Sequence, residues 1–170
     1  MFFLHEIERI VNLHPSYFGP KMEDEINKSL TDALEGKNMG SYFVLCILQN
    51  WEISEGRCVP GTGTAEYTVH LKAVVWKPFR GEIVDGRVKN VIENGFFVEI
   101  GPLSCFVNKN MIPSDMVYDG NATPPQWTDN ADQVIEKGTQ VRLKIKGIRG
   151  EIGDMFSIGT IKEDYLGLLS

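Results

Sequence analysis

The chain has 170 residues, enough for one domain or two small ones, and its 42% hydrophobic and 24% charged content is that of an ordinary globular protein. No apolar run approaches the roughly 20 residues that a membrane-spanning helix needs, and the N-terminus lacks a basic leader, so we expect an intracellular protein with no membrane partner. A formal net charge of −6, with neither half basic, excludes a protein that binds duplex DNA tightly through many Lys and Arg contacts to phosphate.

The start of the chain predicts a strand and then one amphipathic helix. Residues 2–13 form a mixed apolar segment that favours a strand. Pro20 suits the first helical position, and the acidic residues 23–25 suit the positive end of the helix dipole. Gly36 is expected to end the helix in a left-handed conformation. One apolar side chain every four residues gives the helix a stripe that a sheet can cover: Met22, Ile26, Leu30 and Leu34.

Three strands are expected after the helix. Residues 41–48 are nearly continuously apolar, and residues 51–60 favour a shorter strand. Residues 67–76 alternate apolar and polar side chains, the period of a half-buried strand. One helix on an antiparallel sheet gives an α+β domain, which we expect to span residues 1–79.

The second half, residues 80–170, predicts an all-β OB-fold barrel. Residues 83–91 alternate between two faces, and Gly95 and the pair Gly101–Pro102 mark turns on either side of a short strand. Two further strands are expected at 139–147 and 155–161. The insertion at 110–137 contains four residues of Pro or Gly that break regular structure and few periodic apolar residues, so we expect a loop that is mobile or makes contacts. The breakers are Pro113, Gly120, Pro124 and Pro125.

Three segments carry a resemblance to a known family. They are LHPSYFGP at 13–20, WKPFRGEIVDG at 76–86 and IKEDYLG at 161–167. In this order and at these spacings they resemble the stalk subunits of RNA polymerases, the family of the seventh subunit of eukaryotic RNA polymerase II and of its archaeal counterpart, E-prime. The resemblance covers essentially the whole chain. It implies a truncated ribonucleoprotein-like domain followed by an OB-fold RNA-binding domain.

Two loops of the first half carry residues that suit a docking surface. Connecting loops are usually hydrophilic, yet these hold aromatic, aliphatic and proline side chains, which suggests contact with a partner. The alternative is that these side chains fold back over the domain edge. The resemblance implies that the loops form a tip that inserts into the polymerase core near its clamp. The candidate docking residues are Tyr17, Phe18, Val59, Pro60, Gly61 and Gly63.

Phe97 is the main candidate for stacking on a base. The second half resembles the RNA-binding OB module first found in a ribosomal protein, and Phe97 matches the aromatic of that module's Gly-Ala-Phe-Val motif. Alternation puts Phe96 and Phe97 on opposite faces, so one of them must fill the core. We expect Phe97 to face outward, where stacking is worth about 1–3 kcal/mol per base.

Other residues of the barrel depart from the module or add charge. Asn94 and Asn108 replace an aromatic and the histidine of its Gly-Leu-Val-His motif, which predicts weaker RNA binding than a full module gives. Asn108 can still hydrogen-bond a base edge, and Lys109 is the expected phosphate contact. An outward basic stripe in the strand at 139–147 either follows a phosphate backbone or remains a solvated face. This basic stripe consists of Arg142, Lys144 and Lys146.

No catalytic or metal-binding constellation is visible. His5, His14 and His70 lie in three different predicted elements, without a HExxH, GxSxG or Walker motif. The odd number and wide spacing of the cysteines argue against a CxxC metal site and a disulfide framework. Each lies in or beside an apolar run, so we expect mostly buried, reduced thiols at Cys46, Cys58 and Cys105. We expect no cofactor and no metal.

The resemblance therefore implies a non-catalytic subunit of DNA-directed RNA polymerase II, located in the nucleus, with the cytoplasm as a second location. It implies pairing with the fourth subunit in a stalk heterodimer, docking on the core near the clamp, contact with emerging single-stranded RNA and support of transcription initiation. Two alternatives stay open: a stalk subunit of polymerase I or III, and a free-standing OB-fold RNA-binding protein. The short length and the KEDYLG ending favour polymerase II, and the match over the first half speaks against a free-standing protein.

Overall fold

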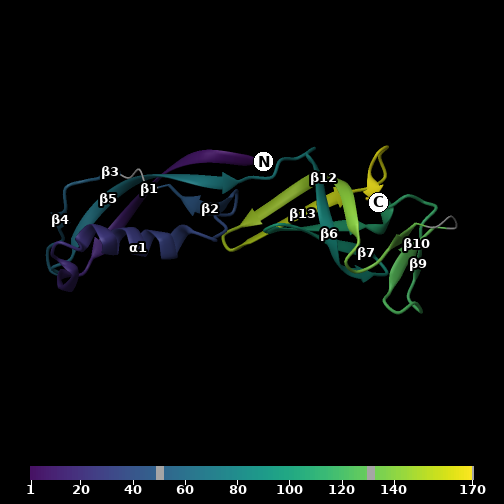
Figure 1. Cartoon of the computed structure of the whole chain (residues 1–170), viewed down its shortest axis with the longest axis horizontal. Helices are drawn as coiled ribbons and strands as arrows, with labels where there is room; N and C mark the ends of the chain where they lie inside the picture. The colour runs from purple at the N-terminus through teal and green to yellow at the C-terminus, as the bar shows by residue number, and fades with distance from the viewer. Residues whose placement is uncertain (49–51, 130–132, 170) are drawn as a thin grey trace. The chain divides into compact units, whose positions relative to one another are not determined.

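The chain folds into two compact units. A computed structural model describes residues 1–48, 52–129 and 133–169 (Figure 1). The first unit comprises Met1–Lys77 and the second comprises Pro78–Ser170. Each unit has its own sheet and its own core, and each is described by itself below.

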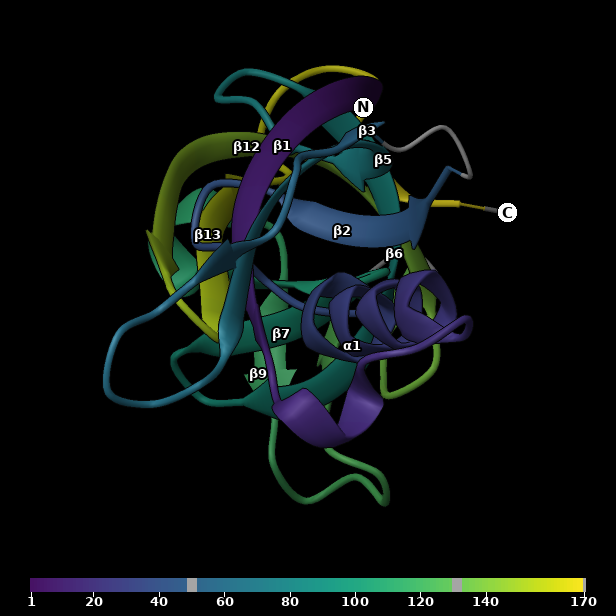
Figure 2. The same cartoon turned by 90° about the vertical axis from the view of Figure 1, so that its left-hand side faces the viewer.

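The first unit is one helix on an antiparallel sheet. Its sheet has the order β1-β5-β2, and the short strands β3 and β4 also pair with β5. Figures 1 and 2 show α1 lying along one face of this sheet. The predicted α+β architecture is confirmed. In chain order the elements are β1 (Phe2–Leu13), the 3₁₀ turn η1 (Pro15–Tyr17), α1 (Met22–Leu34), β2 (Phe43–Ile47), β3 (Glu52–Ile53), β4 (Arg57–Cys58) and β5 (Ala65–Trp76).

Alternation along β5 builds the core of the first unit. The odd-numbered side chains from Ala65 to Val75 are buried, as the period of a strand with one covered face requires. The predicted helix stripe meets them, because Ile26, Leu30 and Leu34 are buried in the same cluster and Met22 packs against it. Burying one such side chain contributes about 1.5–3 kcal/mol. Packing against the sheet therefore holds α1 in place.

Two local predictions in this unit need correction. The helix begins at Met22 with Lys21 as N-cap, so Pro20 is not the first helical residue; the Met22 amide instead closes a turn onto the Gly19 carbonyl at 3.1 Å. The predicted strand at 51–60 is split into β3 and β4, which pair with β5 at separate places; Trp51 lies outside the described residues. Gly36 does follow the helix with φ +69°, as predicted.

The second unit is a closed OB barrel with an added strand and a small side sheet. Its main sheet has the order β13-β8-β7-β6-β12-β14, and β12 also pairs with β13, which closes the barrel. β8 and β13 run parallel, as the Greek-key connection of an OB fold requires. The elements are β6 (Ile83–Ile92), β7 (Gly95–Ile100), β8 (Leu103–Asn108), η2 (Lys109–Met111), β9 (Val117–Asp119), β10 (Gln126–Thr128), β11 (Val134–Ile135), β12 (Gln140–Glu151), β13 (Asp154–Thr160) and β14 (Gly167–Leu168).

Glycines allow the barrel strands to approach closely. A Cβ at Gly95 would collide with the carbonyl oxygen of Val107, and one at Gly86 would lie 2.5 Å from a Val98 methyl. Any side chain at these two positions would push β7 away from its neighbours. Apolar side chains on the inner face then fill the interior: Val88, Phe96, Val98, Leu103, Val107, Val141, Leu143 and Ile145.

The insertion at 110–137 is not a structureless loop within its described part. It contains β9, β10 and β11, which form a three-stranded antiparallel sheet. Trp127 is buried, and its indole N–H points to the carbonyls of Ile92 and Gly95 at 3.3 and 3.4 Å. The sequence interpretation missed this sheet because its strands are too short to show a period, and one aromatic anchors them to the barrel.

Candidate nucleic-acid interface

An aromatic slot lies on the outer face of the barrel, where β7, β8, β12 and β13 contribute side chains. Phe96 is fully buried and Phe97 points outward and is half-buried, as predicted. The Phe97 ring packs on Phe106, with ring centroids 4.8 Å apart and planes tilted by 43°. The two rings form one wall of a hollow of about 300 Å³.

The opposite part of the slot was not foreseen from the sequence. Phe156 and Ile158 of β13 are 51% and 53% exposed, and Ile148 of β12 is 37% exposed. The sequence did contain a signal for this exposed apolar surface. Residues 155–161 carry apolar side chains on both faces of a strand, although such a strand needs only one buried face. We use the name aromatic slot for Phe97, Phe106, Ile148, Phe156 and Ile158.

The polar edge of the slot is cationic. Arg149 lines the hollow and is held only loosely by Glu151, since their charged atoms are 3.8 Å apart and both side chains are largely exposed. An apolar hollow with a loosely held positive charge at its rim suits a planar base with a phosphate beside it. Stacking on such a surface is tolerant of sequence, because every base has a flat face.

Asn108 and Lys109 lie at the end of β8. The Asn108 side-chain oxygen accepts the Asn110 amide at 3.0 Å and caps η2, so one of its polar atoms is already used. The Lys109 amide donates to the Asn94 carbonyl at 2.9 Å, which fixes this corner to the turn before Gly95. In the part of the chain that the structure describes, the exposed Lys109 ammonium has no ion-pair partner. It is therefore available to a phosphate.

The basic stripe faces outward as predicted, but its charges are paired. Arg142 holds both carboxylate oxygens of Asp85, with Nε and Nη2 at 2.7 and 2.8 Å. Lys144 and Lys146 both reach Glu163, at 2.7 and 2.6 Å. The sequence could not show these pairs because Asp85 and Glu163 come from elements far away along the chain.

The pairing also appears in the acidity of the carboxyl groups. The hydrogen bond from Arg142 holds the pKa of Asp85 below its ordinary value. Hydrogen bonds from Lys144 and then Lys146 do the same for the pKa of Glu163. Both carboxylates therefore stay charged at neutral pH, and a phosphate must displace them to reach the stripe. Pairs this exposed contribute little to stability.

The two tip loops of the first unit lie side by side. A Cβ built on Gly63 would be 3.8 Å from the Pro15 side chain, which brings residues 59–64 next to η1. Tyr17 and Phe18 are 50% and 45% exposed, and Pro60 is exposed while Val59 is half-buried. The φ angles of Gly61 and Gly63, +90° and +68°, belong to the left-handed region that favours glycine. The two loops thus present one surface with exposed rings at the same end of the unit.

The histidines of the first unit lie apart from one another and have local partners. No group of three His, Cys, Asp or Glu side chains within them could hold a metal ion. His14 caps η1 by accepting the Ser16 amide, while His70 lies 3.8 Å from Glu8 on the neighbouring strand. None of the helices in the described ranges is long and apolar enough to cross a membrane.

The cysteine prediction is wrong for two of three residues. Cys46 and Cys58 are exposed, and only Cys105 is buried. The error arose because β2 and β4 lie at the sheet periphery, where an apolar run does not ensure burial. Burial raises the pKa of the Cys105 thiol to about 11, which makes it unreactive.

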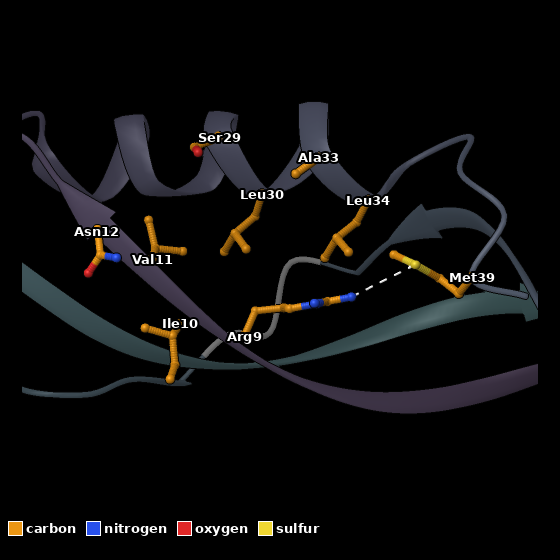
Figure 3. A pocket seen from close by; sticks show the side chains of 9 residues that line it. All are labelled: Arg9, Ile10, Val11, Asn12, Ser29, Leu30, Ala33, Leu34 and Met39. Carbon is orange, nitrogen blue, oxygen red and sulfur yellow. Dashed lines mark hydrogen bonds between the residues drawn. The ribbon is translucent and has the colours of Figure 1, made fainter. Parts of the chain in front are cut away.

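A second hollow lies between β1 and α1 of the first unit (Figure 3), with a volume of about 350 Å³. Figure 3 shows Arg9 reaching along it toward Met39, whose sulfur accepts a weak hydrogen bond at 3.8 Å. Aliphatic side chains such as Leu30 and Leu34 form its floor. Since no carboxylate, histidine or cysteine lines this hollow, it lacks the groups for acid–base or metal chemistry.

Comparisons with known proteins match both units. Residues 77–159 match the family described as "S1 RNA binding domain", and residues 8–63 match "SHS2 domain found in N terminus of Rpb7p/Rpc25p/MJ0397". The chain is 48% identical to the DNA-directed RNA polymerase II subunit rpb7 of Schizosaccharomyces pombe, over 99% of both chains. It belongs to the Rpb7 family of RNA polymerase II subunits.

Members of the Rpb7 family from distant organisms align over the whole chain. The Saccharomyces cerevisiae subunit RPB7 is 38% identical, over 99% of this chain and 100% of its own. The archaeal subunit Rpo7 of Saccharolobus shibatae is 27% identical, over 99% and 96%. The resemblance read from three short segments is therefore confirmed, and with it the order of an SHS2 domain followed by an S1-type OB barrel.

Proposed function

We propose that this chain is the non-catalytic stalk subunit of DNA-directed RNA polymerase II in the nucleus. The observation that carries the proposal is the 48% identity to a polymerase II subunit rpb7 across the full length of both chains. In this function the chain pairs with the fourth subunit, docks on the polymerase core near the clamp, contacts emerging single-stranded RNA and supports initiation. Its own residues then provide binding surfaces and no step of the chemistry.

The RNA contact is assigned to the aromatic slot. Among the residues that the structure describes, no carboxylate lines this hollow, in which Phe156 is exposed and Phe97 and Phe106 are half-buried. The basic stripe, in contrast, already has carboxylate partners. Phe97 and Phe156 stack bases, Lys109 and Arg149 hold phosphates, and Asn108 offers its remaining polar atoms to a base edge. Arg142, Lys144 and Lys146 contribute only when RNA displaces Asp85 and Glu163. With a net charge of −6 the binding is weak and salt-dependent.

Docking on the core is assigned to the tip loops. Tyr17 and Phe18 supply exposed rings, which dominate many interfaces, and Val59 and Pro60 extend the apolar surface on the neighbouring loop. Gly61 and Gly63 give that loop its left-handed turns. Because the rings are not part of the core of the unit, replacing them should remove contacts without unfolding the protein.

The deciding experiment is a purification with a matched variant. The tagged chain is expressed in its own cells, and the co-purifying proteins are identified by mass spectrometry. The expected result is the fourth subunit together with the polymerase II core. Replacing Tyr17 and Phe18 by Ser should reduce the core and leave the fourth subunit. Retention of the core at the wild-type level would show that docking occurs elsewhere.

A stalk subunit of polymerase I or III is the second candidate, and the family matched by the first unit has named members besides Rpb7p. The same purification separates the two, since the three polymerases differ in their largest subunits. The full-length similarity to polymerase II subunits from yeasts, Dictyostelium discoideum and plants favours polymerase II. A free-standing RNA-binding protein would recover neither core nor fourth subunit.

A further inference from the structure

The segment before β14 holds an aromatic residue in a strained and exposed position. Tyr165 has a φ angle of +64°, and among the described residues no other non-glycine residue has a positive φ. Its side chain is 97% exposed, so its ring gains almost nothing from packing in this chain. The left-handed conformation costs free energy for a residue with a bulky side chain. Packing of the ring does not offset this cost, because the ring is almost fully exposed.

The chain on both sides of Tyr165 is fixed. On one side, β14 pairs with β12, where Gly167 lies opposite Arg142 and Leu168 opposite Val141. On the other side, Glu163 binds Lys144 and Lys146 of β12. The turn itself is closed by the Leu166 amide, which donates to the Glu163 carbonyl at 3.3 Å. Tyr165 is thus presented at the tip of an anchored turn.

A hollow of about 380 Å³ lies beside the ring. Its apolar part includes Ile83, whose side chain is 58% exposed, and Leu166. Its charged part is Asp85, Arg142 and Asp164. Arg142 and Asp85 cancel one another in their two-bond pair, whereas Asp164 has no ion-pair partner among the residues that the structure describes. The uncancelled charge that lines the hollow is therefore negative.

We propose that this hollow is a docking site for a basic segment of a partner protein. A Lys or Arg side chain lies against the face of Tyr165 and reaches the Asp164 carboxylate, and a neighbouring aliphatic side chain packs on Ile83 and Leu166. Cations bind to aromatic faces, and tyrosine is enriched among the residues that dominate interfaces. RNA fits less well, because its phosphates would meet an unpaired carboxylate. This site shares no lining residue with the aromatic slot or the tip loops, and it borders the basic stripe at Arg142.

The test is a titration of the ¹⁵N-labelled full chain, followed by NMR. The probe is the peptide acetyl-Leu-Arg-Leu-amide, and the matched probes are acetyl-Leu-Glu-Leu-amide and a six-nucleotide oligouridylate. The expected result is saturable shifts of the Asp164, Tyr165 and Leu166 amides with the arginine peptide alone. The absence of such shifts, equal shifts with the glutamate peptide, or shifts of these amides by the RNA would each overturn the proposal.

Variants separate the proposed contact from a structural role of the turn. Asp164→Asn and Tyr165→Ala should each weaken peptide binding at least fivefold, while Tyr165→Phe keeps it. Asp154→Asn, which removes another exposed carboxylate of the barrel, should have no effect. Tyr165→Gly should abolish binding and yet raise the melting temperature, because glycine accepts a positive φ. A lower melting temperature would show that the fold itself needs the ring, and would also overturn the proposal.

Discussion

The aromatic slot and the basic stripe are two surfaces of the same barrel, and they differ in what already occupies their binding groups. The slot presents rings and aliphatic side chains that lie open, with Phe156 and Ile158 about half exposed. The stripe presents three cations, each within 2.8 Å of a carboxylate of this chain. An outward-facing charged side chain is therefore not by itself a binding surface. A charge that is already paired within the chain interacts less strongly with an external ligand.

The two surfaces also differ in how they depend on salt. Stacking on the slot depends little on ionic strength, whereas each phosphate neutralised on a single strand adds about 0.7 to the slope of log K against log salt. Affinity and slope thus report on the two surfaces separately. The predictions below use this difference, from the largest expected change to the smallest.

Removing the rings of the slot should have the largest effect. Phe97→Leu and Phe156→Leu keep apolar volume but lose the flat face, so each should cost about 1–3 kcal/mol of stacking, roughly 5- to 150-fold in affinity. The slope against salt should stay the same. Fluorescence anisotropy with a short unstructured RNA across a salt series measures both quantities.

The matched control for these variants is Val117→Ala, which truncates another exposed apolar side chain of the second unit. It should leave RNA affinity unchanged. Unaltered affinity in both slot variants, with the fold intact by circular dichroism, would move the RNA contact away from the slot.

Freeing the stripe should strengthen binding instead of weakening it. Glu163→Gln removes the carboxylate that Lys144 and Lys146 share, so both ammonium groups become available to phosphate. RNA affinity at low salt should rise, and the slope should steepen by up to about 1.4, or 0.7 for each lysine. Glu23→Gln makes the same charge change at an exposed helix residue of the first unit and serves as the control. Equal responses of the two variants would mean that only net charge matters and that the stripe does not touch RNA.

The sequence was informative wherever a local pattern determined the structure. The alternation in β5 and the apolar side chains along α1 predicted the helix-on-sheet packing of the first unit. Phe96 and Phe97 lie on opposite faces of β7, as the strand period requires. The sequence interpretation was wrong or incomplete where the structure depends on contacts between residues far apart in the chain. Asp85 lies 57 residues from Arg142, and Trp127 anchors its sheet to carbonyls more than 30 residues away. Neither contact can be predicted from the spacing of residues along the chain.

Lys109 and Arg142 should respond differently when each is replaced by Ala. Lys109 has no ion-pair partner in the described part of the chain, so its loss should lower the slope by about 0.7 and weaken binding modestly. Arg142 is held by Asp85 and should change the slope little. The same salt series measures both. A larger effect from Arg142 would show that RNA displaces Asp85 from it, and would restore the stripe as a primary phosphate site.

The smallest effect concerns the stability that the stripe's pairs contribute as pH changes. Hydrogen bonding to Arg142 lowers the pKa of Asp85 in the folded chain below its ordinary value of 3.8. A lowered pKa stabilises the folded state at every pH above the pKa of the unfolded state, and this contribution is lost as pH falls through the folded pKa.

The melting temperature of the wild type should therefore exceed that of Asp85→Asn by a small and constant amount from about pH 7 to pH 5. The difference should shrink below 3.8 as Asp85 takes up a proton. A difference between wild type and Asp85→Asn that stays constant down to about pH 3 would mean that the charge of Asp85 does not hold Arg142, and the stripe would then be open to phosphate.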